Sequence, residues 1–178
     1  MRNAIKEVLI SEEEIRNRTR ELGREITEDY KDKDLVLIGI LKGAAIFMSQ
    51  LSMDIDLPLY MDFMSVSSYG KASRSTGEVR IVKDLDESVE GKDILIVEDI
   101  IDTGLTLSYL KDNLLKRGAS SVKVVTLLDK PDRRNVLVDI DYLGFEVPDE
   151  FIVGYGLDYA EKYRNFPFVA ALKEEIYK

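Results

Sequence analysis

The sequence predicts an α/β fold in which a mostly parallel, twisted sheet is flanked by helices in a doubly wound arrangement. Strand-like and helix-like segments alternate along the chain. Several strand-like segments are short apolar runs without polar alternation, as in parallel strands that are covered on both faces. The length of 178 residues suits one domain, and no linker, internal repeat or low-complexity tract divides it. We therefore expect residues 1–178 to form a single domain.

Each element follows from a local pattern. Ser11 followed by Glu14 is a capping box, and apolar residues then recur at helical spacing to about Tyr30. Gly118 follows the basic end of another helical pattern, where a helix is expected to stop. The expected helices are residues 12–30, 44–53 and 106–117. The expected strands are residues 35–40, 59–66, 79–82, 94–97, 122–128 and 151–153.

The composition excludes several classes of chemistry. The chain has no His, Cys or Trp, so it has no Ser-His-Asp triad, no thiolate nucleophile and no His-ligated zinc. With 25 Lys and Arg against 34 Asp and Glu, its formal charge is −9, which disfavours binding to nucleic acid. The longest apolar run, residues 35–41, is far shorter than the roughly 20 residues of a membrane span, and the N-terminus lacks a signal-peptide pattern. We expect a cytoplasmic protein with no membrane partner.

Charged or glycine-containing residues follow the expected strands. These strand ends are Lys42-Gly43, Glu98-Asp99, Asp129-Lys130 and Asp158. In open α/β sheets, ligands bind at the carboxyl ends of the strands, so we expect these residues to gather at one edge of the sheet. No single strand end is decisive, but together they predict a site.

The densest of these segments is residues 97–106, Val-Glu-Asp-Ile-Ile-Asp-Thr-Gly-Leu-Thr. Two acids end a buried strand, and hydroxyls and a glycine then lead into a helix. Free N–H groups and hydroxyls at a helix N-terminus bind phosphate, and adjacent acids can accept hydrogen bonds from a sugar diol. Asp102 or Thr103 alone could simply cap the helix, but the whole run favours a site for a sugar phosphate.

This run resembles the phosphoribosyl pyrophosphate motif of the type I phosphoribosyltransferases, and residues 98–104 look like the version in hypoxanthine-guanine phosphoribosyltransferases. Further segments match in the same order, so the resemblance covers nearly the whole chain. The matching segments are the pyrophosphate loop at 41–43 (whose Leu-Lys peptide is typically cis in the family), the lid at 67–70, the base-recognition strand end at 129–130 and the purine and metal segment at 151–164. The resemblance implies a small hood from the terminal segments and a mobile hairpin lid containing Ser68 and Tyr69.

The resemblance also implies an activity and a set of site residues. The reaction would be purine salvage, in which hypoxanthine or guanine and 5-phosphoribosyl 1-pyrophosphate give IMP or GMP and pyrophosphate. Asp102 would be the catalytic general base toward the purine N7–H, in place of a histidine. The implied nucleotide-binding residues are Lys42, Gly43, Glu98, Asp99, Asp102, Thr103, Gly104, Leu105, Thr106 and Arg164. The implied purine-binding residues are Lys130, Phe151, Ile152 and Asp158, and the implied Mg²⁺ residues are Asp158, Glu98 and Asp99.

Some of these implications have alternatives. Family members often carry Lys or another polar residue where Leu105 stands, so only its backbone is expected to contact phosphate. Lys130 could be a solvated strand end, Phe151 ordinary core, and Arg164 a partner of Glu161 on a helix face. The family expectation for assembly is a homo-oligomer, either a dimer or a tetramer.

Two rival functions are compatible with an α/β fold. A nucleotide-sensing regulatory protein of the same fold is the alternative, although a sensor needs no base at Asp102 and the chain shows no basic face. A dinucleotide-binding oxidoreductase needs G-x-G-x-x-G after its first strand, and residues 39–43, Gly-Ile-Leu-Lys-Gly, do not supply it.

Overall fold

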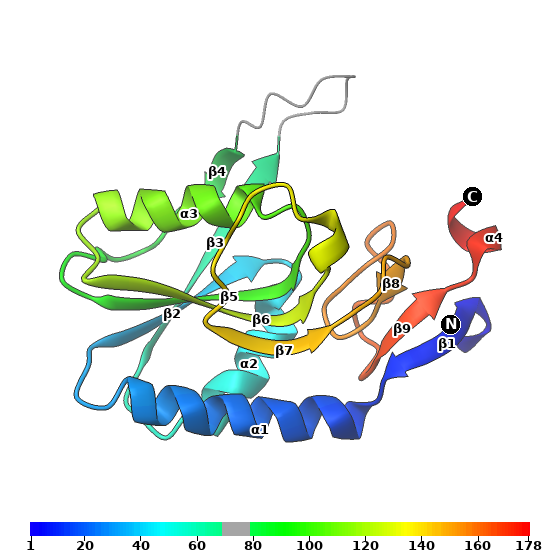
Figure 1. The fold of residues 1–178 in the computed structure, drawn as a ribbon, viewed down its shortest axis with the longest axis horizontal. Helices are drawn as coiled ribbons and strands as arrows, with labels where there is room; N and C mark the ends of the chain where they lie inside the picture. Colours follow the sequence, from blue (N-terminus) through cyan, green and yellow to red (C-terminus); the bar gives the residue numbers. More distant parts are fainter. Residues whose placement is uncertain (69–78) are drawn as a thin grey trace.

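A computed structural model describes residues 1–68 and 79–178, which form two sheets (Figure 1). The larger sheet has six strands in the order β4-β3-β2-β5-β6-β7 and is parallel except for the antiparallel β3–β4 pair at one edge. Its strands are β2 (Leu35–Leu41), β3 (Tyr60–Ser68), β4 (Val79–Lys83), β5 (Asp93–Ile101), β6 (Ser121–Asp129) and β7 (Tyr142–Glu146). The predicted α/β fold with a mostly parallel sheet is confirmed.

Helices cover both faces of this sheet. α1 (Glu12–Asp29) and α2 (Ala44–Asp54) pack on one face, and α3 (Leu105–Lys116) packs on the other (Figure 1). Alternate residues of each strand enter different cores: Leu37 packs with the α1 and α2 side chains, whereas Ile38 packs with those of α3. Burial on both faces explains why β2 and residues 94–97 of β5 are unbroken apolar runs.

The second sheet is a small antiparallel hood beyond the carboxyl end of β7 (Figure 1). Its strand order is β1-β9-β8, with β1 (Ile5–Ile10), β8 (Ile152–Val153) and β9 (Val169–Leu172). We use the name hood for these strands together with the short helix α4 (Glu174–Tyr177) that follows β9. Two 3₁₀ turns, at Arg2–Ala4 and Pro131–Arg133, complete the elements. The first and last elements of the described chain therefore lie together in the hood.

Two predictions about strands were wrong. β5 does not end at the acids Glu98 and Asp99 but continues to Ile101, because its pairing with β6 continues as far as Asp129. Residues 151–153 were expected in the parallel sheet, but β8 pairs with β9 in the hood. The strand that completes the parallel sheet is β7, which the sequence analysis missed together with β1 and β9.

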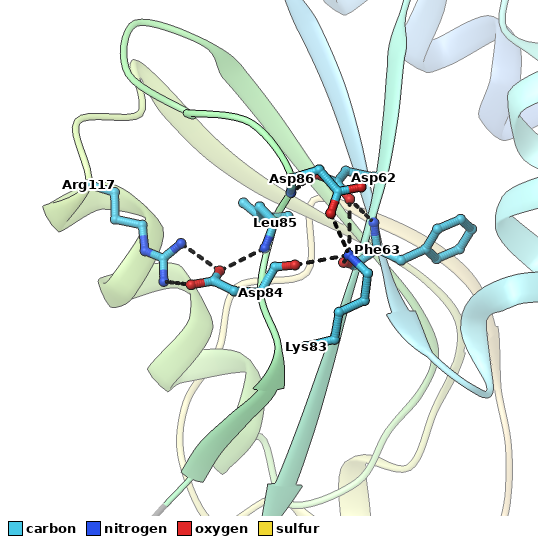
Figure 2. A network of polar contacts seen from close by, with 7 residues as sticks. All are labelled: Asp62, Phe63, Lys83, Asp84, Leu85, Asp86 and Arg117. Carbon is cyan, nitrogen blue, oxygen red and sulfur yellow. Dashed lines mark hydrogen bonds and ion pairs between the residues drawn. The ribbon is translucent and has the colours of Figure 1, made fainter.

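A polar network at the amino edge of the large sheet ties the β3–β4 hairpin to α3 (Figure 2). Arg117 at the end of α3 donates two hydrogen bonds to Asp84, at 2.7 and 2.8 Å. Lys83 lies 3.2 Å from Asp86, whose backbone N–H donates to the buried Asp62 at 2.8 Å. The base of the hairpin is thus fixed at the edge opposite the strand carboxyl ends. Among the described residues, no helix is both long and apolar enough to cross a membrane.

Candidate active site at the carboxyl edge of the sheet

The turn between β5 and α3 leaves a helix N-terminus open to a pocket. Gly104 has a left-handed φ of 84°, and a Cβ there would lie 2.8 Å from the carbonyl oxygen of Val136, so glycine suits this close approach. A pocket of about 240 Å³ lies over the turn. Its polar lining comes from Glu98, Asp102, Thr103, Gly104 and Thr106. Carboxylates, hydroxyls and free helix N–H groups are the groups that bind a sugar phosphate.

Asp102 sits directly after β5 with one of its carboxylate oxygens unpartnered. Its Oδ2 lies 3.4 Å from Arg133 Nη1, while Oδ1 is buried and has no hydrogen-bond partner within residues 1–68 and 79–178. Arg134 donates from Nε to the Asp102 carbonyl oxygen at 3.2 Å and also pairs with Asp129. Because an unpartnered buried acceptor is costly, Oδ1 is suited to accept a hydrogen bond or a proton from a bound molecule.

Glu98 and Asp99 are charged groups placed in a largely buried strand. Burial raises the pKa of the Glu98 carboxyl well above its usual range, and the neighbouring Asp99 adds to this rise. Burial also raises the pKa of Asp99 to about 6, although the Ile100 N–H, which donates to it at 2.8 Å, and the charge of Arg164 oppose this rise. Carboxyl groups whose pKa is raised by burial are typical of a functional site rather than of a stable core.

These raised pKa values predict a pH-dependent cost to stability. A carboxyl with a higher pKa in the folded state contributes stability that is present below its unfolded pKa and is lost as the pH rises through its folded pKa, here from about 4 to about 6 for Asp99. We expect Asp99→Asn to increase the free energy of unfolding at pH 7.5 by about 1–3 kcal/mol, and to have little effect near pH 4. Urea unfolding at both pH values measures this difference. Asp132→Asn, at an exposed position, is the control, and an Asp99→Asn effect that does not change with pH would contradict the assignment.

The turn after β2 packs against both Asp99 and a loop of the hood. The Leu41–Lys42 peptide is cis, as the resemblance implies. A Cβ on Gly43 would lie 1.7 Å from Asp99 Oδ2, and a Cβ on Gly156 would lie 2.0 Å from the Gly43 carbonyl oxygen. Three segments that are distant in sequence therefore meet here through glycine backbone.

The loop from 154 to 164 carries the charges that face this junction. Arg164 Nη2 lies 2.9 Å from Asp158 Oδ1, and Arg164 Nη1 donates to the Gly156 carbonyl oxygen at 2.8 Å. Lys42 Nζ lies 3.0 Å from Glu161 Oε2, which also lies 3.4 Å from Arg164. Non-glycine residues of this loop with positive φ are Tyr155, Ala160, Glu161 and Tyr163. Such strained backbone persists where the surrounding structure enforces it, often at ligand sites.

Lys130, Phe151 and Ile152 lie where β6 meets the hood. Lys130 is only 8% exposed, its Nζ donates to the Glu150 carbonyl oxygen at 2.7 Å, and burial lowers the pKa of its ammonium group. Lys130 is therefore not a solvated strand end. Phe151 is 38% exposed, so it is not ordinary core, whereas the Ile152 side chain is buried and only its backbone is available for binding.

The structure gathers most of the expected residues but not all of them. Leu105 begins α3 and is exposed. Ser68 ends β3, and Tyr69 lies outside the described residues. Glu161 pairs with Arg164 as foreseen, but in a loop and not on a helix face. Arg133, Arg134 and Asp149 were missed as site neighbours, although the charged run that follows Lys130 was visible in the sequence.

Comparison with known proteins identifies the class. The sequence model of the phosphoribosyl transferase domain matches residues 9–160. The chain belongs to this family, as the motifs at 41–43, 98–106 and 151–164 indicated.

Similar proteins carry more specific names. The hypoxanthine-guanine phosphoribosyltransferase of Bacillus subtilis is 58% identical over 178 residues, which are 100% of this chain and 99% of that protein. A crystal structure of a hypoxanthine phosphoribosyltransferase from Staphylococcus aureus matches with a TM-score of 0.97 at 53% identity, covering 100% of this chain and 97% of that one. The bifunctional protein TilS/HprT of Listeria innocua is 59% identical over 177 residues, and this chain spans only 27% of its length.

Proposed function

We propose that this protein transfers the phosphoribosyl group of 5-phosphoribosyl 1-pyrophosphate to hypoxanthine or guanine. A purine ring nitrogen forms the glycosidic bond at C1′ while the bond from C1′ to the pyrophosphate oxygen breaks, and the N7 proton passes to Asp102. The observation that carries this proposal is the buried Asp102 Oδ1, which has no hydrogen-bond partner in the described part of the chain. Asp102 lies at the turn that leads into α3, and the neighbouring strand β6 ends at the buried Lys130. The names of the relatives support the choice of purine.

The sugar phosphate would lie along the β5–α3 turn. Glu98 and Asp99 would accept hydrogen bonds from the ribose hydroxyls. The backbone and hydroxyls of residues 102–106 would bind the 5′-phosphate, for which the open N-terminus of α3 is suited. The remaining pyrophosphate-binding residues in this proposal are Lys42, Gly43 and Arg164. Gly43 packs against Asp99 and Gly156, Arg164 donates to the Gly156 carbonyl oxygen, and Lys42 pairs with Glu161 of the same loop, which supports that grouping.

The donor chemistry of this edge fits Mg²⁺, which we propose as the cofactor. Asp158 would hold it, and Glu98 and Asp99 are the other candidate ligands, since all three offer the oxygen atoms that Mg²⁺ prefers. Among the described residues, no three Asp, Glu, His or Cys side chains converge as a closed metal cage. When bound, Mg²⁺ supplies charge neutralisation for the diphosphate on a chain whose formal charge is −9.

Lys130 would set the preference for 6-oxopurines. Its ammonium would donate to O6 of hypoxanthine or guanine, whereas the amino group of adenine would present another donor. We expect Lys130→Ala to raise KM for hypoxanthine by about tenfold or more and to narrow the hypoxanthine-over-adenine preference, with KM for phosphoribosyl pyrophosphate changed by less than about threefold. Steady-state kinetics with both bases measures this, with Lys123→Ala, a lysine elsewhere on β6, as the control. A preserved base preference would contradict the assignment.

Pyrophosphate release tests the proposed activity directly. The protein would be mixed with phosphoribosyl pyrophosphate, Mg²⁺ and either hypoxanthine, guanine, xanthine or adenine, and release would be followed for each. We expect turnover with hypoxanthine or guanine and little with adenine. No turnover at micromolar enzyme with any base, combined with binding of the nucleotide, would instead favour a regulatory protein of the same fold.

The rest of the proposal concerns the protein as a whole. We propose that residues 1–178 act as one phosphoribosyltransferase domain, because Phe151 and Asp158 come from the hood and its loop while Asp102 and Lys130 come from the large sheet. We also propose that the protein is cytoplasmic and forms a homo-oligomer. Sedimentation equilibrium of the purified chain measures the oligomeric state.

A further inference from the structure

Phe151 lies against two tyrosine rings of the C-terminal part of the chain. The ring of Tyr177 in α4 stacks on Phe151 with 4.9 Å between centroids and 21° between planes. The ring of Tyr159 meets Phe151 at 5.3 Å and 87°. Phe151 nevertheless stays 38% exposed, so the two tyrosines do not enclose it. Phe151 therefore keeps part of its surface accessible beside the two tyrosines.

The stacked pair is fixed by the backbone that carries it. The Leu172 N–H donates to the Phe151 carbonyl oxygen at 2.9 Å, and the Lys173 N–H donates to the Ala4 carbonyl oxygen at 3.0 Å. α4 follows immediately, and Tyr177 packs partly buried against the hood core. The two rings therefore come from neighbouring, hydrogen-bonded chain segments, which sets their relative position.

The same segment also anchors Lys130. The Lys130 ammonium donates to the carbonyl oxygen of Glu150, the residue directly before Phe151. A purine that contacts both the Lys130 ammonium and the Phe151 ring would need these two groups at a fixed distance and orientation relative to each other. An exposed phenylalanine without a stacked neighbour would sample several rotamers and would lose that freedom when a purine binds.

We propose that Tyr177 is a positioning residue for the purine, a role that rests on the proposed function. It holds the Phe151 ring in a plane on which a purine can stack, without touching the reacting atoms. An aromatic pair contributes a modest free energy of interaction in addition to the burial of its surface. The loss of purine affinity on removing Tyr177 should therefore be modest as well. Tyr177 is far along the chain from the phosphate-binding turn and lies in a different element. Replacing it should therefore weaken binding of the purine but not binding of phosphoribosyl pyrophosphate.

Kinetics of Tyr177→Ala, Tyr177→Phe and Tyr60→Ala test this role. For Tyr177→Ala we expect KM for hypoxanthine to rise roughly three- to tenfold, with kcat and KM for phosphoribosyl pyrophosphate within about twofold of wild type. Tyr177→Phe keeps the ring and should restore the wild-type KM. Tyr60→Ala removes a half-exposed tyrosine at the other edge of the sheet and should change nothing. Calorimetric titration with GMP should show the same loss of affinity for Tyr177→Ala.

Several outcomes would overturn the role. A lower hypoxanthine KM in Tyr177→Ala would mean that Tyr177 occupies the face that the purine needs. An unchanged KM, or an equal rise in both substrate KM values, would show that it does not position the base. If Tyr177→Ala unfolds, Tyr177→Leu must still show the base-selective loss. Failure of the wild-type protein to turn over any purine would refute the proposed function instead, and the GMP titration would then decide the role of Tyr177 separately.

Discussion

Replacing Asp102 by Asn is expected to lower kcat by about 10²–10⁴-fold, the range that a positioned general base contributes. Asparagine has the same shape and can still face Arg133, but it cannot take the N7 proton. KM for phosphoribosyl pyrophosphate should therefore change by less than about threefold. Steady-state kinetics at saturating concentrations of both substrates separates these two effects.

The control for this variant is Asp132→Asn, which removes a carboxylate from an exposed site in the adjacent 3₁₀ turn. It should keep the wild-type kcat. If Asp102→Asn also kept the wild-type kcat, Asp102 would not be the base, and the unpartnered Oδ1 would need another explanation. A fall in kcat together with a large rise in KM for phosphoribosyl pyrophosphate would indicate that the turn itself had been disturbed.

Replacing Gly156 by Ala should damage both stability and binding of phosphoribosyl pyrophosphate. Gly156 has a φ of 106°, which L side chains rarely adopt, and its new Cβ would lie 2.0 Å from the Gly43 carbonyl oxygen. The strained φ alone costs about 1–3 kcal/mol, and the contact forces the 154–164 loop away from the turn after β2. We expect the free energy of unfolding to fall by more than about 2 kcal/mol and KM for phosphoribosyl pyrophosphate to rise at least tenfold.

Gly91→Ala separates the cost of the strained φ from the cost of the contact with Gly43. Gly91 also has a positive φ, 73°, but a Cβ there would meet nothing within 4 Å. It should lower the free energy of unfolding by only about 1–2 kcal/mol and leave both KM values unchanged. Urea unfolding and steady-state kinetics on both variants make the comparison. A Gly156→Ala protein that matched Gly91→Ala in both measurements would show that the contact with Gly43 is not needed.

The central sheet could be predicted because its strands are buried on both faces. Residues 35–41 are apolar throughout, and such a short apolar run is typical of a strand that is covered by helices on both sides. The capping box at Ser11 is present as predicted, because its pattern is local to one helical turn. The family could be predicted because short motifs such as residues 98–106 combine several specific residue types in one order. The match of the family's sequence model to residues 9–160 confirms it.

The hood and its loop could not be predicted in the same way. β8 is two residues long, and half of the β1 residues are exposed, so neither has a strong periodic pattern. The positive φ of Glu161 and Tyr163 is not indicated by their own residue types, because non-glycine residues rarely adopt it. The raised pKa of Asp99 likewise depends on how deeply β5 is buried, which the residue order alone does not show.

The connectivity of the hood constrains how the protein can be made. β9 is the middle strand of the hood sheet, and both β1 and β8 pair with it. β1 is synthesised first but has no sheet partner until residues 169–172 leave the ribosome. The large sheet and the turn after β5 can therefore form on the nascent chain before the hood sheet does. A stalled or truncated product would present β1 as an unpaired edge, which is a template for aggregation.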